Sequence, residues 1–141
     1  MITAFLDTNI LLDYILNRPP FSKDALSIID FAERGIIEAA VSSASIYTVT
    51  YFIQKVHSPS RSAKIIGEFI RIVSVLPTDT HMIGRALGKH ARDLEDAYQY
   101  ETALSYPPAD YFVTRNIKDF KEFETSLPVI SQGDFLLKIA S

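Results

Sequence analysis

Three aspartates lie where predicted secondary-structure elements begin or end. Asp7 directly follows an apolar run over residues 2–6. Asp96 stands in the first turn of a predicted helix, where the helix dipole favours a carboxylate, and Asp119 follows a predicted strand over residues 111–114. In an open α/β sheet, ligands bind at the edge where the carboxyl ends of the strands meet. The three acids can therefore converge on one ligand site.

Carboxylates that are held close together repel each other, and the repulsion keeps some of them protonated. A divalent, oxygen-seeking cation relieves this repulsion. Mg²⁺ fits such a site because it needs only one or two carboxylates and keeps several waters. A bound Mg²⁺ ion can activate a water molecule and stabilise the charge on a phosphate in transit. The positions of the acids thus indicate metal-assisted phosphate chemistry.

Each acid also has a structural interpretation. Asp7 alone would be an ordinary helix N-cap. Asp93 lies three residues before Asp96, a spacing that favours a helix cap over a ligand. Asp119 could be a solvated turn residue. Asp110 precedes an apolar strand, which would put it at the wrong end of the sheet.

The elements that must position these acids alternate regularly along the chain. We predict strands over residues 2–6, 36–41, 73–76, 111–114 and 128–130, with amphipathic helices between them and after the last one. Residues 46–56 are strongly apolar and long enough for a helix, although their β-branched content also suits a strand. This order predicts an α/β fold, a three-layer α/β/α sandwich around a central, mostly parallel sheet of four to five short strands.

The composition limits the class of protein. A chain of 141 residues with 48% hydrophobic content is expected to form one domain over residues 1–141. It has no cysteine, which excludes disulfides and thiolate metal sites and fits the cytoplasm. No stretch predicts a signal peptide or a membrane span. The net charge of −3 argues against binding nucleic acid through bulk charge, but it allows a local basic patch.

The chain resembles PIN-domain proteins, a nuclease-like α/β/α family that includes the VapC-type toxins of bacterial toxin–antitoxin pairs. Three segments carry the resemblance: residues 7–12 (DTNILL), residues 93–97 (DLEDA), and residues 110–116 (DYFVTRN) with 118–120 (KDF). Their order in a chain of this size is specific, and they span nearly the whole sequence.

The resemblance implies a metal-dependent endoribonuclease in which a water activated by Mg²⁺ or Mn²⁺ hydrolyses RNA phosphodiesters. It assigns the metal to Asp7 and Asp96 and makes Asp119 the acid contributed after the fourth strand. Further polar residues would line or support the pocket, namely Thr8, Asn9, Thr114 and Asn116. Family members commonly form homodimers and are held inactive by an antitoxin protein, so both partners are expected here.

One acid of the family pattern is missing. The family's second acid is usually a Glu early in the helix that follows the second strand. When residues 42–43 are aligned with the family's serine, Thr48 takes that place, and residues 42–54 contain no acid. Three outcomes are open: the metal binds more weakly, Asp93 or Asp110 substitutes, or catalysis is lost.

Basic residues offer two candidate phosphate contacts. Arg85, Lys89 and Arg92 are spaced i, i+4, i+7 on one helix face that leads into Asp93. This face is either a patch that follows the RNA backbone or an ordinary solvated surface. Arg115 is the better single candidate, because a planar guanidinium binds phosphate oxygens in pairs.

Other features leave a second function class open. Without the missing Glu, a PIN-like fold could serve as an RNA- or protein-binding module. An aspartyl nucleophile is disfavoured, because Thr8 and Asn9 follow Asp7 where such folds carry paired acids. The aromatic region around Tyr47 and Tyr51 is expected in the core, with a dimer or partner surface as the alternative. The three histidines show no ligand spacing and are expected on the surface.

Overall fold

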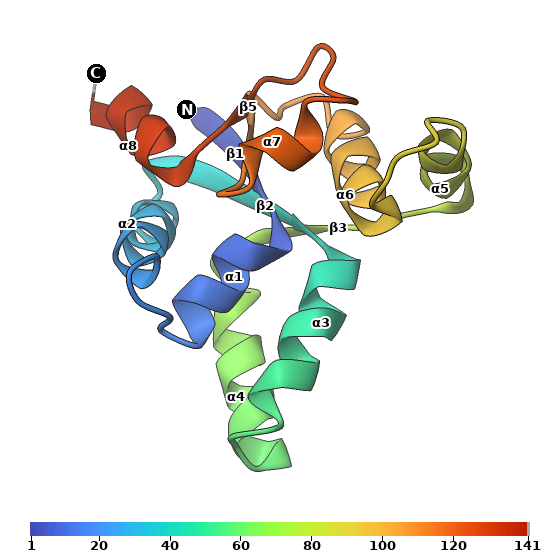
Figure 1. The fold of residues 1–141 in the computed structure, drawn as a ribbon. Helices are drawn as coiled ribbons and strands as arrows, with labels where there is room; N and C mark the ends of the chain where they lie inside the picture. The colour runs from blue at the N-terminus through green and yellow to red at the C-terminus, as the bar shows by residue number, and fades with distance from the viewer. Residues whose placement is uncertain (141) are drawn as a thin grey trace.

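Five parallel strands form the centre of the molecule, which we describe from a computed structural model over residues 1–140 (Figure 1). They pair in the order β3-β2-β1-β4-β5, and every neighbouring pair is parallel. Their bounds are β1 (Ile2–Leu6), β2 (Ile37–Ser42), β3 (Ser74–Leu76), β4 (Tyr111–Val113) and β5 (Val129–Ile130). The predicted α/β class is confirmed, and the sheet is parallel throughout these residues.

Helices connect the strands and cover the sheet. They are α1 (Thr8–Ile15), α2 (Ser22–Glu33), α3 (Ser43–Ile53), α4 (Pro59–Phe69), α5 (Thr80–Leu87), α6 (Leu94–Leu104), α7 (Ile117–Phe120) and α8 (Gln132–Ala140). The ambiguous apolar stretch after β2 is therefore a helix. Its start is fixed by Ser42, whose hydroxyl accepts a hydrogen bond from the Ser45 amide at 3.0 Å. Such an N-cap stabilises a helix by about 1 kcal/mol.

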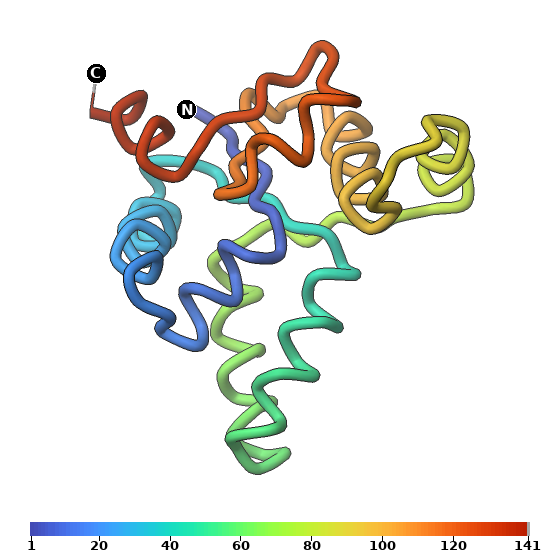
Figure 2. The backbone as a smooth tube through the Cα atoms, viewed as in Figure 1, coloured from blue at the N-terminus to red at the C-terminus, as the bar shows by residue number. Residues whose placement is uncertain are grey.

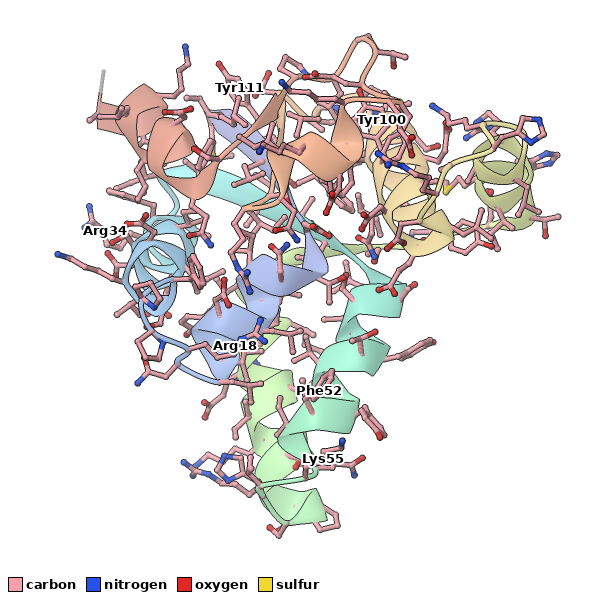
Figure 3. The ribbon with its side chains drawn as sticks, in the orientation of Figure 1. Arg18, Arg34, Phe52, Lys55, Tyr100 and Tyr111 are labelled. Carbon is pink, nitrogen blue, oxygen red and sulfur yellow. The ribbon has the colours of Figure 1, made fainter. Side chains whose placement is uncertain are left out.

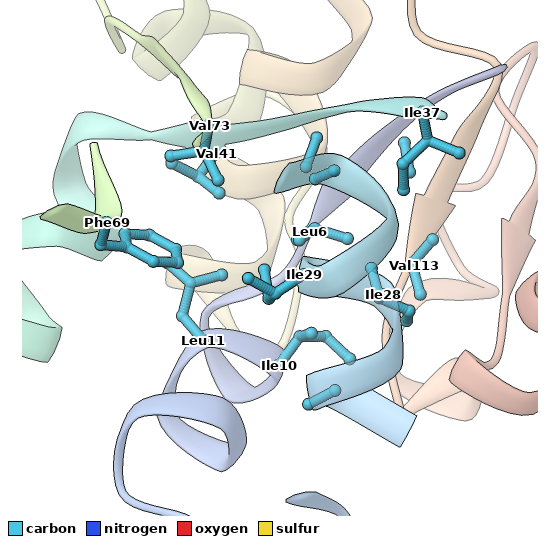
Figure 4. Packing of buried hydrophobic residues seen from close by; sticks show 14 of the residues in the cluster. Leu6, Ile10, Leu11, Ile28, Ile29, Ile37, Val41, Phe69, Val73 and Val113 are labelled. Carbon is cyan, nitrogen blue, oxygen red and sulfur yellow. The ribbon is translucent and has the colours of Figure 1, made fainter. Parts of the chain in front are cut away.

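Alternate residues of the central strand face two separate cores. Ala4 and Leu6 point into the larger core, which α1, α2, α3, α4 and α8 cover (Figure 4). Phe5 points into a second core beneath α5, α6 and α7. This second core is rich in aromatic rings, and Phe5 stacks on Phe112 with their centroids 5.4 Å apart. Helices on both faces of the sheet confirm the predicted three-layer arrangement.

The strand order places a topological switch point beside β1. The chain adds β2 and β3 on one side of β1 and then returns to place β4 on the other side. Leu6 pairs with Val113, so the residues after β1 and after β4 are neighbours. A crevice at such a reversal is the usual ligand site of an open α/β sheet. Asp110 lies at the opposite end, where its carboxylate accepts from the Thr3 amide at 2.8 Å, as predicted.

Helices α3 and α4 run side by side away from the sheet and form an arm (Figure 2). Phe52 and Lys55 lie on this arm (Figure 3), and the Lys55 ammonium sits 4.5 Å from the centre of the Tyr51 ring. The side chains of Tyr47 and Tyr51 are 75% and 60% exposed, so the prediction that they pack in the core is wrong. Across residues 1–140, every helix is too short or too polar to cross a bilayer.

Candidate active site

Asp7 lies at the carboxyl end of β1, next to the switch point. Its backbone amide donates to the Val113 carbonyl at 3.0 Å, which extends the pairing of β1 with β4 by one bond. One carboxylate oxygen accepts from the Thr8 amide at 2.8 Å. The other accepts from the Thr114 hydroxyl at 2.9 Å and from the Asn9 side-chain amide at 3.1 Å. Asp7 is therefore both the N-cap of α1 and a fixed carboxylate at the sheet edge.

Burial makes the charge on Asp7 costly. The residue is only 5% exposed, and loss of hydration raises the pKa of its carboxyl to about 6. The hydrogen bonds from Thr114 and Thr8 lower the pKa, while the charges of Glu95 and Asp93 raise it further. The carboxyl of Asp7 thus titrates about two pH units above the ordinary value for aspartate.

Asp96 lies in the first turn of α6, within electrostatic range of Asp7. Partial burial and then the charge of Asp7 raise the pKa of its carboxyl to about 7. Asp93, Asp119 and Glu95 add to this rise. The structure therefore brings both Asp7 and Asp119 close enough to Asp96 to repel it, although the three acids come from three different helices or their caps.

Asp93 and Asp119 are exposed acids near Asp96. Asp93 is the N-cap of α6, and its carboxylate accepts from the Asp96 amide at 3.0 Å. This is the cap geometry that its spacing predicts. Asp119 is exposed on the short helix α7, and its amide donates to the Asn116 carbonyl at 3.0 Å. Both acids raise the pKa of Asp96 through their charge, while Asp7 and Asp96 are themselves the more buried pair.

Thr114 connects the polar residues on the β4 side. It is fully buried, donates to Asp7, and accepts from the Asn116 amide at 3.1 Å. The Asn9 side-chain amide lies 3.4 Å from the same hydroxyl. The Asn9 carbonyl oxygen is buried and has no hydrogen-bond partner among residues 1–140. The Asn116 residue is exposed, and its side chain does not cap α7.

Arg115 points away from these acids toward a buried partner on α1. Its guanidinium donates two hydrogen bonds to Asp13, at 2.8 and 3.2 Å. Asp13 is fully buried, and it also pairs with Arg18 at 3.0 Å. The guanidinium carbon of Arg115 lies 4.2 Å from the centre of the Phe21 ring. In this arrangement Arg115 secures the turn after β4, and a phosphate contact by Arg115 stays a prediction.

A neutral hydrogen-bonded network of Thr8, Ser42, Ser45 and Gln99 lies beside the acids. Sequence reasoning missed two of its members, Ser45 and Gln99. The Thr8 hydroxyl shares a hydrogen bond of 2.6 Å with the Ser45 hydroxyl. Gln99 on α6 donates from its side-chain amide to the Ser42 hydroxyl at 2.9 Å. The hydroxyl oxygens of Ser42 and Ser45 lie 3.1 Å apart. The sequence signal for Gln99 was its place one turn after Asp96, which puts both residues on the same side of α6.

Thr48 takes the position of the missing acid, so this position carries a hydroxyl in place of a carboxylate. Thr48 lies on α3, and its hydroxyl donates to the Ala44 carbonyl one turn earlier, at 3.3 Å. The nearby buried polar groups of α3 are the hydroxyls of the neutral network. The α3 side of the pocket is therefore polar but uncharged.

The basic residues before α6 are ion-paired. Arg85 and Lys89 each lie 2.9 Å from a carboxylate oxygen of Glu101, which is 3% exposed. Arg92 lies 3.8 Å from Glu122. The side chains of Arg85 and Lys89 are 51% and 24% exposed, so they are partly solvated while they also neutralise a buried acid. Both cations are therefore engaged in joining α5 to α6.

The residues present fit a cation that keeps most of its own waters. Among residues 1–140, no cluster of three or more acids, histidines or cysteines is tight enough to hold a metal ion. The three histidines are exposed, as predicted. Asp7 and Asp96 nevertheless offer two oxygen ligands whose repulsion a cation would relieve, and Mg²⁺ needs no more than two carboxylates. The chemistry of the donor set therefore suits Mg²⁺ or Mn²⁺.

Comparison with solved structures gives the same fold over nearly the whole chain. VapBC2 from Rickettsia felis, bound to a promoter DNA fragment, matches with a TM-score of 0.67 at 19% identity, covering 92% of this chain and 98% of that one. DNA-bound VapBC from Salmonella typhimurium matches with a TM-score of 0.67 at 22% identity, covering 94% of this chain and 99% of that one. VapBC-1 from nontypeable Haemophilus influenzae matches with a TM-score of 0.66 at 24% identity, covering 94% of this chain and 99% of that one.

Sequence comparison identifies the family directly. The PIN domain profile matches residues 3–118, a range that contains Asp7, Asp96 and Thr114. No curated protein matches the chain. The resemblance of the three acidic segments to PIN-domain proteins is thereby confirmed, and the chain belongs to the PIN domain family.

Proposed function

We propose that this PIN-domain protein is an endoribonuclease that depends on Mg²⁺ or Mn²⁺. The observation that carries the proposal is a pair of acids with raised pKa values near the switch point of the sheet: burial raises the pKa of the Asp7 carboxyl to about 6, and partial burial with repulsion by the Asp7 charge raises that of Asp96 to about 7. Strongly perturbed acids in a crevice are typical of functional sites. A site that only stabilised the fold would gain nothing from this repulsion.

The proposed roles of the side chains differ with how deeply each one is buried. Asp7 and Asp96 would hold the metal, which supplies an activated water and a counter-charge for the phosphate. Thr114 and Asn9 keep the Asp7 carboxylate in one orientation through their hydrogen bonds. Asp119 is exposed at the rim, where it can accept a proton from a water molecule and orient it toward a phosphodiester.

The proposed biological role is that of the toxin in a toxin–antitoxin pair. The structural relatives are VapBC proteins, and a toxin–antitoxin complex from Klebsiella pneumoniae matches with a TM-score of 0.66 at 21% identity. On this basis an antitoxin protein is the expected partner, with RNA as the substrate and a homodimer as the assembly. The exposed Tyr47 and Tyr51 on the arm supply apolar surface for such contacts.

Cleavage of RNA by the purified protein tests the proposal. We expect cleavage of a mixed-sequence, single-stranded RNA with Mg²⁺ or Mn²⁺, no cleavage with EDTA, and a loss of at least 100-fold in Asp96→Asn. Asp110→Asn serves as the matched control, because Asp110 caps the opposite end of the sheet. Cleavage that persists in EDTA, or that Asp96→Asn leaves intact, contradicts the proposal.

A second candidate follows from the uncharged α3 side of the pocket. With Thr48 in place of an acid, the fold could act as a binding module for RNA or protein. Calorimetric titration with Mn²⁺ separates the two functions. Binding that Asp7→Asn and Asp96→Asn abolish supports the enzyme, whereas no binding at millimolar Mn²⁺ supports the module.

A further inference from the structure

The neutral network forms a continuous bridge between the helices that carry the two buried acids. The bridge runs from Gln99 on α6 through Ser42 and Ser45 to Thr8, the residue next to Asp7. Gln99 and Asp96 are separated by one helical turn. Both ends of the bridge therefore lie within one turn of a carboxylate that repels its counterpart.

The bridge is buried, and its hydrogen bonds saturate it. Ser42, Ser45 and Gln99 are each at most 2% exposed, and Thr8 is 7% exposed. The Ser42 hydroxyl accepts from the Gln99 amide and from the Ser45 backbone amide, at 2.9 and 3.0 Å. The Gln99 carbonyl lies 3.2 Å from the Ser42 hydroxyl and 3.4 Å from that of Ser45. A fully satisfied buried network of this kind rigidifies the elements that it joins.

The charge of Asp7 on α1 repels that of Asp96 on α6, and the bridge joins these same two helices. The apolar contacts of the second core also pack α6 against the sheet, but they are non-directional. Hydrogen bonds are directional, and the bridge ends at the residue after Asp7 and one helical turn from Asp96. A change in the spacing of the two carboxylates therefore distorts the hydrogen bonds of Gln99.

We propose that Gln99 is a positioning residue that fixes Asp96 relative to Asp7 through the two serine hydroxyls. The inference rests on the proposed function, because it assigns to Gln99 the spacing of the two carboxylates that would hold the metal. Gln99 itself contacts neither carboxylate among the hydrogen bonds of residues 1–140. Its effect on a metal would therefore pass entirely through the helices that it joins.

Gln99→Met tests the inference, because methionine keeps the length of the side chain and removes its hydrogen bonds. Titration of the full-length protein with Mn²⁺ alone should show at least tenfold weaker binding than in the wild type, as is typical when support behind a metal ligand is lost. Saturating Mn²⁺ should restore most of the RNA cleavage. Ser45→Ala, which cuts the bridge at its centre with a smaller change in volume, should weaken Mn²⁺ binding in the same direction.

Thr102→Val is the matched control on the same helix. Thr102 is 1% exposed, and its hydroxyl bonds to Thr78 at 2.6 Å, away from the acids. This variant should lower the melting temperature comparably but leave Mn²⁺ affinity within twofold of the wild type. Equal Mn²⁺ affinity in Gln99→Met, Ser45→Ala and the wild type overturns the inference and leaves the nuclease proposal standing. No Mn²⁺ binding by the wild type overturns both.

Discussion

The carboxylate of Asp7 should destabilise the folded protein at neutral pH. Burial raises its folded-state pKa from 3.8 to about 6. Between these two pH values, the native protein therefore holds a proton on Asp7 that the unfolded chain has released. For an acid with a raised pKa, stability falls as the pH rises from the unfolded value through the folded value. The penalty is thus small at pH 4 and complete above about pH 7. At completion it amounts to about 3 kcal/mol for a shift of about two pH units.

Asp7→Asn removes this penalty, together with the part of the rise in the pKa of Asp96 that the Asp7 charge causes. Asparagine keeps the volume and an oxygen for the Thr8 amide, which donates to Asp7 at 2.8 Å. Hydrogen bonds that the variant loses change the stability by a constant amount, whereas the removed charge gives a part that depends on pH. The stability of Asp7→Asn relative to the wild type should therefore increase by about 2 kcal/mol between pH 4.5 and pH 7.5.

Urea unfolding, followed by far-UV circular dichroism in buffer with EDTA, measures this difference. The chain has no tryptophan, so circular dichroism is the more direct signal. Asp110→Asn, at the opposite edge of the sheet, is the control for removing a hydrogen-bonded carboxylate away from Asp7 and Asp96. A difference between Asp7→Asn and the wild type that stays constant from pH 4.5 to pH 7.5 would refute the reasoning, because the Asp7 charge would then carry no folding penalty.

Two further variants probe the surroundings of Asp7. Thr114→Val removes the hydroxyl that donates to Asp7 at 2.9 Å and lowers its pKa, so the pKa of Asp7 should rise further and the acidic limb of the pH–cleavage profile should move to higher pH. An unmoved acidic limb contradicts this role of Thr114. Asp13→Asn leaves two arginines without their buried acid and should reduce the free energy of unfolding by about 3 kcal/mol in urea titration. A loss below about 1 kcal/mol would mean that solvent replaces Asp13 as their partner.

The layer architecture was predictable because it depends on the periodicity of apolar residues. Strand β1 alternates Ala4, Phe5 and Leu6 between two cores, and the helices carry apolar stripes that cover both faces. The acids at the strand ends followed from the same pattern, since parallel strands gather their carboxyl ends at one edge. Asp7 and Asp96 could therefore be brought together from the sequence alone.

Features that depend on side-chain direction were not predictable. Arg115 follows the pocket residue Thr114 in the sequence, but its guanidinium turns to Asp13. Tyr47 and Tyr51 look like core residues by type, yet α3 leaves the sheet and exposes them. Hydropathy fixes which residues are apolar, but tertiary packing decides which helix face meets the sheet.

The same limit applies to the ion pairs and the neutral network. Arg85 lies on α5, but Lys89 follows the end of that helix, so the predicted common helix face is wrong, and their shared partner Glu101 comes from the next helix and is buried. Gln99 meets Ser42 across a gap of 57 residues in the sequence. Contacts between elements so far apart leave no periodic signal in one chain, so these pairings require the fold.

The bridge from Gln99 to Thr8 has one more property, which concerns acidity. Its members are an amide and three hydroxyls, and none of these groups gains or loses a proton across the physiological range. The two acids beside it change their charge between about pH 5 and pH 8. The bridge therefore keeps the same hydrogen-bonding groups while the charge on Asp7 and Asp96 changes with pH. A shift in cellular acidity would then alter how strongly the two acids bind a metal ion without altering their spacing.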